Sequence, residues 1–280
     1  GYDPVVYERR KKSDRSLPLI QKMLEDDPSN MIYQFYEGRE FFIKKQFHEA
    51  VRSLERAMDG LLNGLTGYFS ETLKTLLSAY DHARESDDKI ETMADLGIAQ
   101  EPDQPDFWYF KGHVYLRRGD HARAAELFRE TLRRLEVFTI KEVSQSHPII
   151  SNTPWRAREL FADCLWEIGE YREAYEVFKR VVTEKPNNSS QWPKLLNNSV
   201  ALAIEFEDKE ALLPLLERLL SRPDTQLDMY LFRLEQLEHR GELDELKRLA
   251  QWGRRRCARL KAEPTFKRLW EAHLEPMSAP

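Results

Sequence analysis

The residues most capable of chemistry in this chain are its histidines, its cysteines and its acidic runs. His113 and His121 lie on either side of an expected turn, which is poor geometry for a shared metal ion. Cys164 and Cys257 have no neighbouring Cys or His at the spacing of zinc ligands. The acidic run at 25–27 falls at an expected helix end, where capping and solvation explain it. The sequence therefore predicts no metal site and no cofactor.

Common catalytic motifs are absent from the sequence as well. It contains no Gly-rich phosphate-binding loop, no G-x-S-x-G nucleophile elbow, no H-E-x-x-H zinc helix and no C-x-x-C pair. Each of these chemistries needs its residues at a fixed spacing on one turn or helix. We therefore expect that these 280 residues do not form an enzyme by themselves.

Composition indicates a mostly helical protein with long solvated faces, because 41% of the residues are hydrophobic, 32% are charged and only 11 are glycine. The net charge of -5 gives no general attraction to nucleic acid or to an anionic membrane. The basic segment 254–259 is a candidate for local RNA contact, and a solvated helix face is the alternative. No apolar run approaches the roughly 20 residues that span a bilayer. Unpaired cysteines fit a reducing compartment, so we expect a cytoplasmic protein.

The clearest pattern lies in "PDFWYFKGHVYLRRGDHARAAELFRETL". Trp108, Gly112 and Tyr115 are followed by Ala124 and Phe128 at the W-x₂-x-G-x₂-Y…A-x₃-F spacing of a tetratricopeptide (TPR) repeat, which this segment resembles. Two antiparallel helices approach closely only where small residues lie at their crossing. We therefore expect Gly112 and Ala124 at the close contact, with Tyr115 and Phe128 filling the space beside it.

The same pattern recurs along the chain, most completely in three of its occurrences. It predicts an all-α fold, a right-handed α-solenoid of about six TPR-like helix-turn-helix units in one domain over 16–280. The inserts 65–70 and 139–154 break the register and are expected to loop out. The expected elements are a helix at about 16–27, units 31–64, 71–104, 105–138, 155–188, 192–225 and 227–260, and a capping helix at 264–275.

In TPR units the first helix supplies the concave surface, so the expected groove residues can be read from the register. Aromatic and Arg side chains concentrate binding energy when a partner covers them, which makes a protein or peptide the expected ligand. The alternative is that most of these aromatics pack between neighbouring repeats. Lys and Asn of the chaperone-type carboxylate clamp are missing from these positions, so that partner class is not expected. The predicted groove residues are Phe35, Tyr36, Arg39, Phe42, Tyr109, Phe110, His113, Arg117 and Trp166.

The opening segment resembles the region that joins the catalytic domain to the TPR tail in bacterial family 2 glycosyltransferases. The matching residues are Gly1, Tyr2, Arg15, Leu17, Leu19, Leu24, Pro28, Asn30, Phe35, Gly38 and Glu40. The resemblance implies that 1–15 is a linker from an upstream nucleotide-sugar domain with an acidic metal-binding motif. No catalytic residue of that family falls in these residues. The implied role is a scaffold that binds the acceptor or a partner protein, or that self-associates.

A free-standing TPR adaptor is the alternative function. Such a protein would bind a peptide motif without any catalytic domain in the same chain. The reading frame upstream of Gly1 separates the two hypotheses, because only the first requires an α/β domain there.

Overall fold

The structure, a computed structural model, describes residues 12–61, 68–140, 149–184, 192–223 and 226–274. Within these ranges the chain forms α-helices and two short 3-10 helices, and no β-strand. The predicted all-α fold is thereby confirmed.

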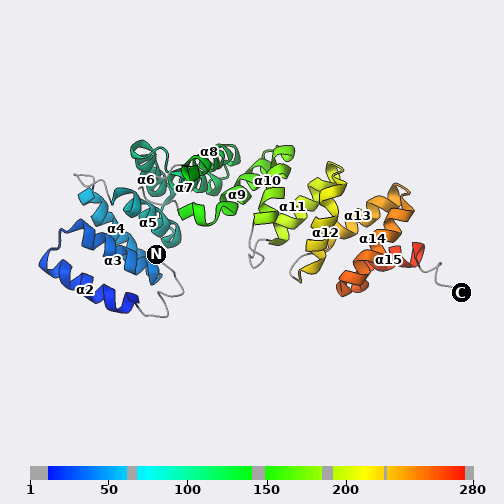
Figure 1. The fold of residues 1–280 in the computed structure, drawn as a ribbon, viewed down its shortest axis with the longest axis horizontal. Helices are drawn as coiled ribbons and strands as arrows, with labels where there is room; N and C mark the ends of the chain where they lie inside the picture. Colours follow the sequence, from blue (N-terminus) through cyan, green and yellow to red (C-terminus); the bar gives the residue numbers. More distant parts are fainter. Residues whose placement is uncertain (1–11, 62–67, 141–148, 185–191, 224–225, 275–280) are drawn as a thin grey trace. The chain divides into compact units, whose positions relative to one another are not determined.

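The chain divides into two compact units within helix α9, after Cys164. Unit 1 runs through blue to green in Figure 1 and unit 2 through green to red. The helices up to the division are α2 (Lys12–Asp26), α3 (Met31–Ile43), α4 (Phe47–Leu61), α5 (Phe69–Ala83), α6 (Asp87–Gln100), α7 (Pro105–Arg117), α8 (His121–Ile140), η1 (Ile149–Asn152) and α9 (Pro154–Glu167). Those after it are α10 (Tyr171–Glu184), α11 (Trp192–Glu205), α12 (Lys209–Ser221), α13 (Asp228–His239), α14 (Leu243–Arg256), η2 (Ala258–Ala262) and α15 (Pro264–His273).

Most consecutive helices pack against each other: in unit 1 each helix from α2 to α7 contacts the next, and in unit 2 α10 contacts α11, α11 contacts α12 and α13 contacts α14. In unit 1 the first helices α3, α5 and α7 also contact one another in order, and in unit 2 α11 contacts α13 while α12 contacts α14. The buried side chains are mainly leucine and aromatic residues on the facing stripes of these helices. First helices therefore form one surface of each unit and second helices another.

Glycines allow the paired helices to approach closely. A methyl group on Gly112 would lie 2.8 Å from Cε1 of Phe128, and one on Gly38 would lie 2.6 Å from Cγ of Leu54. Gly112 thus lies at a close helix contact, as the repeat pattern predicts, but its neighbour there is the Phe128 ring and not Ala124, which is buried; Tyr115, the other predicted filler, is partly exposed.

In the described part of the chain, one residue in the left-handed conformation lies in the turn between the two helices of each of six pairs. Its successor donates its backbone N–H to the carbonyl five residues back, at 2.9–3.0 Å in all six turns. Only half of these positions hold glycine, the residue that adopts this conformation without strain. The six residues, with φ between 53° and 84°, are Lys45, Arg84, Gly119, Gly169, Glu207 and Gly241.

The first helix and the inserts differ from the expectation in detail. Helix α2 begins at Lys12 and contains Pro18 in its interior, whereas the sequence suggested a start near Ser16. Most of the expected linker, residues 1–11, lies outside the described residues, as do residues 65–67 of the first insert and 141–148 of the second. The end of the second insert forms η1.

Replacing Gly112 by alanine should destabilise the protein by about 1–3 kcal/mol, because the new methyl group overlaps the Phe128 ring. In an exposed helix the same change stabilises by about 1 kcal/mol, so the sign identifies the close approach. Chemical denaturation measures the change, and in a Phe128→Leu background most of the penalty should disappear. Equal penalties in both backgrounds would contradict the assigned contact.

Replacing Arg84 by glycine should stabilise unit 1 by about 0.5–1 kcal/mol. The left-handed conformation at φ 57° strains the arginine backbone, and glycine removes that strain at a smaller entropic cost. Thermal unfolding of Arg84→Gly measures the gain, and Gly119→Ala should change stability in the opposite direction. A loss of stability in Arg84→Gly would contradict this account of the turn.

Candidate functional site

The predicted groove residues other than Trp166 lie on the first helices α3 and α7 of unit 1. Phe35, Tyr109 and Phe110 are buried there. Packing against neighbouring helices accounts for these three, and their rings are not offered to solvent. The partly or fully exposed residues are Tyr36, Arg39, Phe42, His113 and Arg117.

An aromatic cluster joins α3 to the start of α5. The ring centroid of Tyr36 lies 5.3 Å from that of Phe35 and 6.3 Å from that of Tyr68, which precedes α5. Phe35 and Tyr68 are 5.7 Å apart. A hydrogen bond with Tyr68 raises the pKa of Tyr36, so the Tyr36 phenol stays neutral at physiological pH. The buried Phe35 thus supports a Tyr36 ring that is accessible from outside.

Phe42 lies at the other end of α3 in a second ring cluster. Its centroid is 5.6 Å from Phe47 on α4 and 5.7 Å from His82 at the end of α5. His82 is exposed, and its Nδ1 lies 2.8 Å from the carbonyl oxygen of Ser78. Phe42 therefore contributes both to packing between helix pairs and to the surface.

Helix α7 holds Tyr109 and His113 in edge-to-face contact, with centroids 4.6 Å apart. Both rings also lie close to Phe128 of α8, at 6.0 Å and 5.8 Å. Burial raises the pKa of Tyr109 to about 12. The Tyr109 ring is therefore uncharged at physiological pH where it packs against the ring of His113.

Arg117 is engaged by two carboxylates. Its guanidinium lies 2.7 Å from Asp81 on α5 and 2.6 Å from Asp87 on α6. These ion pairs link three helices, and because all the groups are partly exposed their net contribution to stability is small, about 0–1 kcal/mol each. The main effect is to hold the Arg117 side chain in one orientation on the surface.

Burial lowers the pKa of His113 to about 4. The charge of Asp81 opposes this shift, whereas Arg117 and Arg156 reinforce it. His113 is therefore neutral at pH 7 and is not a cation on this surface. We name the group Tyr36, Arg39, Phe42, Asp81, His113, Arg117 and Arg156 the first-helix surface; Arg156, an exposed residue of α9 in unit 1, is its member nearest the chain division.

Asp106 has a structural role that sequence reasoning missed. Its buried carboxylate accepts hydrogen bonds from the backbone N–H groups of Ile149 and Ile150, both at 2.9 Å, and so anchors η1 to α7. Burial raises the pKa of Asp106, and the nearby charge of the buried Lys74 acts in the opposite direction. The repeat register gives no sign of this anchor because the bonded segment belongs to an insert.

Trp166 lies in unit 2, apart from the other predicted residues along the chain. Its partly exposed ring stacks edge to face on Tyr171 of α10, with centroids 5.3 Å apart. Tyr171 is 47% exposed, so these two rings form a small aromatic surface at the α9–α10 turn.

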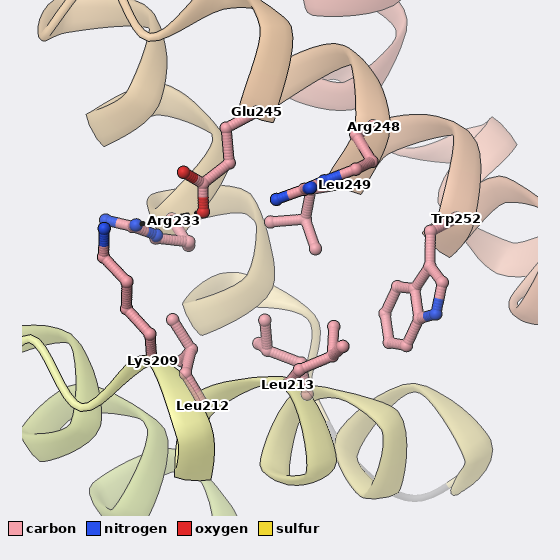
Figure 2. A pocket seen from close by; sticks show the side chains of 9 residues that line it. Lys209, Leu212, Leu213, Arg233, Glu245, Arg248, Leu249 and Trp252 are labelled. Carbon is pink, nitrogen blue, oxygen red and sulfur yellow. Dashed lines mark ion pairs between the residues drawn. The ribbon is translucent and has the colours of Figure 1, made fainter.

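Unit 2 contains a pocket of about 450 Å³ that no sequence pattern predicted, here named the α12–α14 pocket. Figure 2 shows the guanidinium of Arg233 beside Lys209 and Glu245 at one end, and the indole of Trp252 at the other. Leu213 lies between the two ends on α12, and Arg248 lies on α14. The structure leaves Leu213 48% exposed beside the pocket.

Within the described ranges, no group of three or more His, Cys, Asp or Glu side chains is placed to hold a metal ion. Cys164 and Cys257 are buried free thiols. Among the helices that the structure describes, none combines the length and the apolar character needed to cross a membrane.

Two segments match tetratricopeptide repeat family models, residues 91–136 and residues 156–188. The first contains the pair α7–α8, and the second corresponds to the predicted unit 155–188. No curated protein sequence matches the chain. TPR repeats are thus present in both segments.

Solved structures resemble large parts of this chain at low sequence identity. The pilF protein of Pseudomonas aeruginosa is 17% identical with a TM-score of 0.60, covering 83% of this chain and 94% of its own. A tetratricopeptide repeat protein from Parabacteroides merdae is 14% identical with a TM-score of 0.52, covering 96% and 94%. YrrB, a TPR protein with an unusual peptide-binding site, is 15% identical with a TM-score of 0.50, covering 71% and 89%. The fold is therefore an all-α TPR-like solenoid, as predicted.

His113 should make stability depend on pH. Its pKa is about 4 in the folded protein and about 6.5 in the unfolded chain, so between these values the unfolded state binds more protons. Stability from this group is complete above about pH 6.5 and is lost as the pH falls toward 4. Relative to His113→Gln, the wild type should lose on the order of 1 kcal/mol between about pH 7 and about pH 5, after discounting for a partly exposed ring. Thermal unfolding that shows the same stability difference between the two proteins at both pH values would contradict this.

Proposed function

We propose that this chain is a protein-interaction scaffold and that the first-helix surface of unit 1 binds a peptide or protein segment. The observation that carries the proposal is the collection of partly exposed aromatic and charged side chains on α3, α5, α7 and α9. Tyr36 and Phe42 offer ring surface, and Arg156 offers an exposed guanidinium. These are the residue types that contribute most when a partner excludes water from them.

Because His113 is neutral and Arg117 is already paired, we expect a partner that carries both apolar and charged side chains. Arg117 is already held by two carboxylates, so a ligand carboxylate would meet Arg156 first. Such a carboxylate would raise the pKa of His113 by removing the repulsion from Arg156. TPR-fold relatives support this kind of function, since YrrB is described as having a peptide-binding site.

A Tyr36→Ala/Arg156→Glu variant should lose at least roughly tenfold in affinity for partners captured by the wild-type chain. The matched control Tyr33→Ala/Arg123→Glu changes the same residue types outside the first-helix surface and should bind as the wild type does. Quantitative mass spectrometry of captured proteins, with circular dichroism to check folding, measures both. Equal loss in the two folded variants would contradict the assignment of the surface.

The resemblance of the opening segment to glycosyltransferase tails supports a finer form of the proposal. In that form the scaffold presents an acceptor or partner protein to a family 2 transferase domain encoded upstream. The alternative is a free-standing adaptor. The buried free thiols Cys164 and Cys257 support a reducing, cytoplasmic location in either case. Sequencing the reading frame upstream of Gly1 tests the finer form, which requires an α/β domain with an acidic metal-binding motif there.

A further inference from the structure

The α12–α14 pocket has two chemically different ends. Lys209 and Arg233 lie at one end, and the indole of Trp252 lies at the other, with Leu213 between them (Figure 2). Its volume of about 450 Å³ is within the usual range of ligand pockets and holds a few side chains. The pocket is lined by residues of α12, α13 and α14 and shares no residue with the first-helix surface of unit 1.

The cationic end contains a buried arginine whose hydrogen bonding is incomplete. Arg233 is only 6% exposed, and its Nε has no hydrogen-bond partner among the described residues. One of its Nη atoms donates to Gln236, and the other lies 3.7 Å from Glu245, which is an ion pair longer than a hydrogen bond. A buried N–H without an acceptor is costly, so this end of the pocket favours an anion that supplies one.

Two further cations at the pocket are not neutralised. Lys209 and Arg248 are exposed, and neither has a carboxylate within ion-pair distance in the part of the chain that the structure describes. With Arg233 they outnumber the one acid that lines the pocket, Glu245. This local excess is opposite in sign to the net charge of -5 of the chain, so the pocket attracts an acidic group that the chain as a whole repels.

The other end of the pocket is apolar, and neighbouring side chains hold its Trp252 ring in place. Leu213 is 48% exposed, which is high for a leucine beside a cavity. The guanidinium of Arg256 stacks on Trp252 with its carbon 4.5 Å from the ring centroid, and Arg256 is in turn paired with Glu217 at 3.2 Å. The indole therefore presents a fixed surface for a bulky apolar side chain.

We propose that the α12–α14 pocket binds an acidic peptide segment of a partner protein, with a side-chain carboxylate at Arg233 and Lys209 and a bulky apolar side chain between Leu213 and Trp252. Arg248, on the rim, meets a second acidic residue or the same carboxylate. A peptide satisfies both ends with neighbouring side chains, whereas a simple inorganic anion leaves the apolar end unused. The site is separate from the proposed first-helix surface and does not depend on it.

Panning random short peptides displayed on phage against the intact chain tests the proposal. The selected peptides should share an Asp or Glu within a few positions of a bulky apolar residue. A fluorescein-labelled peptide of the selected sequence then gives an affinity by anisotropy. Changing its acid to the amide should weaken binding by at least roughly tenfold. Selection of peptides without a common acid, or no selection at all, would overturn the proposal.

Variants of the chain show where the selected peptide binds. Lys209→Glu/Arg248→Glu should weaken binding by at least roughly tenfold, whereas the matched control Arg255→Glu, on the same helix α14 but outside the pocket lining, should change it by less than roughly twofold. Leu213→Ser should also weaken it while leaving the melting temperature unchanged. Equal effects of the pocket and control variants overturn the proposal.

Two further outcomes also overturn it. Loss of the peptide in Tyr36→Ala/Arg156→Glu, with retention in the pocket variants, would assign the peptide to the first-helix surface. Sedimentation that shows a dimer abolished by Leu213→Ser would make a second copy of this chain the occupant.

Discussion

The six helix pairs depend on one backbone interaction, the hydrogen bond that the residue after each left-handed position donates to the carbonyl five residues back. This bond ends the first helix and reverses the chain within a few residues, so the second helix must pack antiparallel on the first. Close approach then requires a small residue at the crossing, which Gly112 and Gly38 provide. Helix length, the stripe that is buried and the surface that is left exposed all follow from where the turn falls.

The first-helix surface and the α12–α14 pocket differ in how fully their charged groups are already paired within the chain. On the first-helix surface Arg117 is paired with two aspartates and His113 is neutral, so the free capacity for a ligand lies in Arg156, Tyr36 and Phe42. In the α12–α14 pocket a buried guanidinium lacks one acceptor and an exposed leucine lies beside it. The second arrangement is the more specific, because a ligand must satisfy both a charge and an apolar surface at once.

Prediction from the sequence succeeded for features that depend on residues close together in the chain. The all-α fold and the close helix approach at Gly112 could be read from spacing alone, because both depend on residues within one helix pair. Spacing left open whether Phe35, Tyr109 and Phe110 face a groove or pack between repeats, and the structure buries all three. Periodicity states which direction a side chain points, and only the neighbouring helix decides whether it is covered.

The sequence by itself determined a repeating all-α chain, the register of its helix pairs and the types of side chain on each face. Tertiary structure alone decided that Asp106 anchors an insert, that Arg84 and Glu207 adopt the left-handed turn usually held by glycine, and that Arg233 lies buried beside an open apolar pocket. The reason is physical. Helical propensity and hydrophobic period act over a few residues, whereas burial and the pairing of charges depend on how closely helices distant in sequence approach one another.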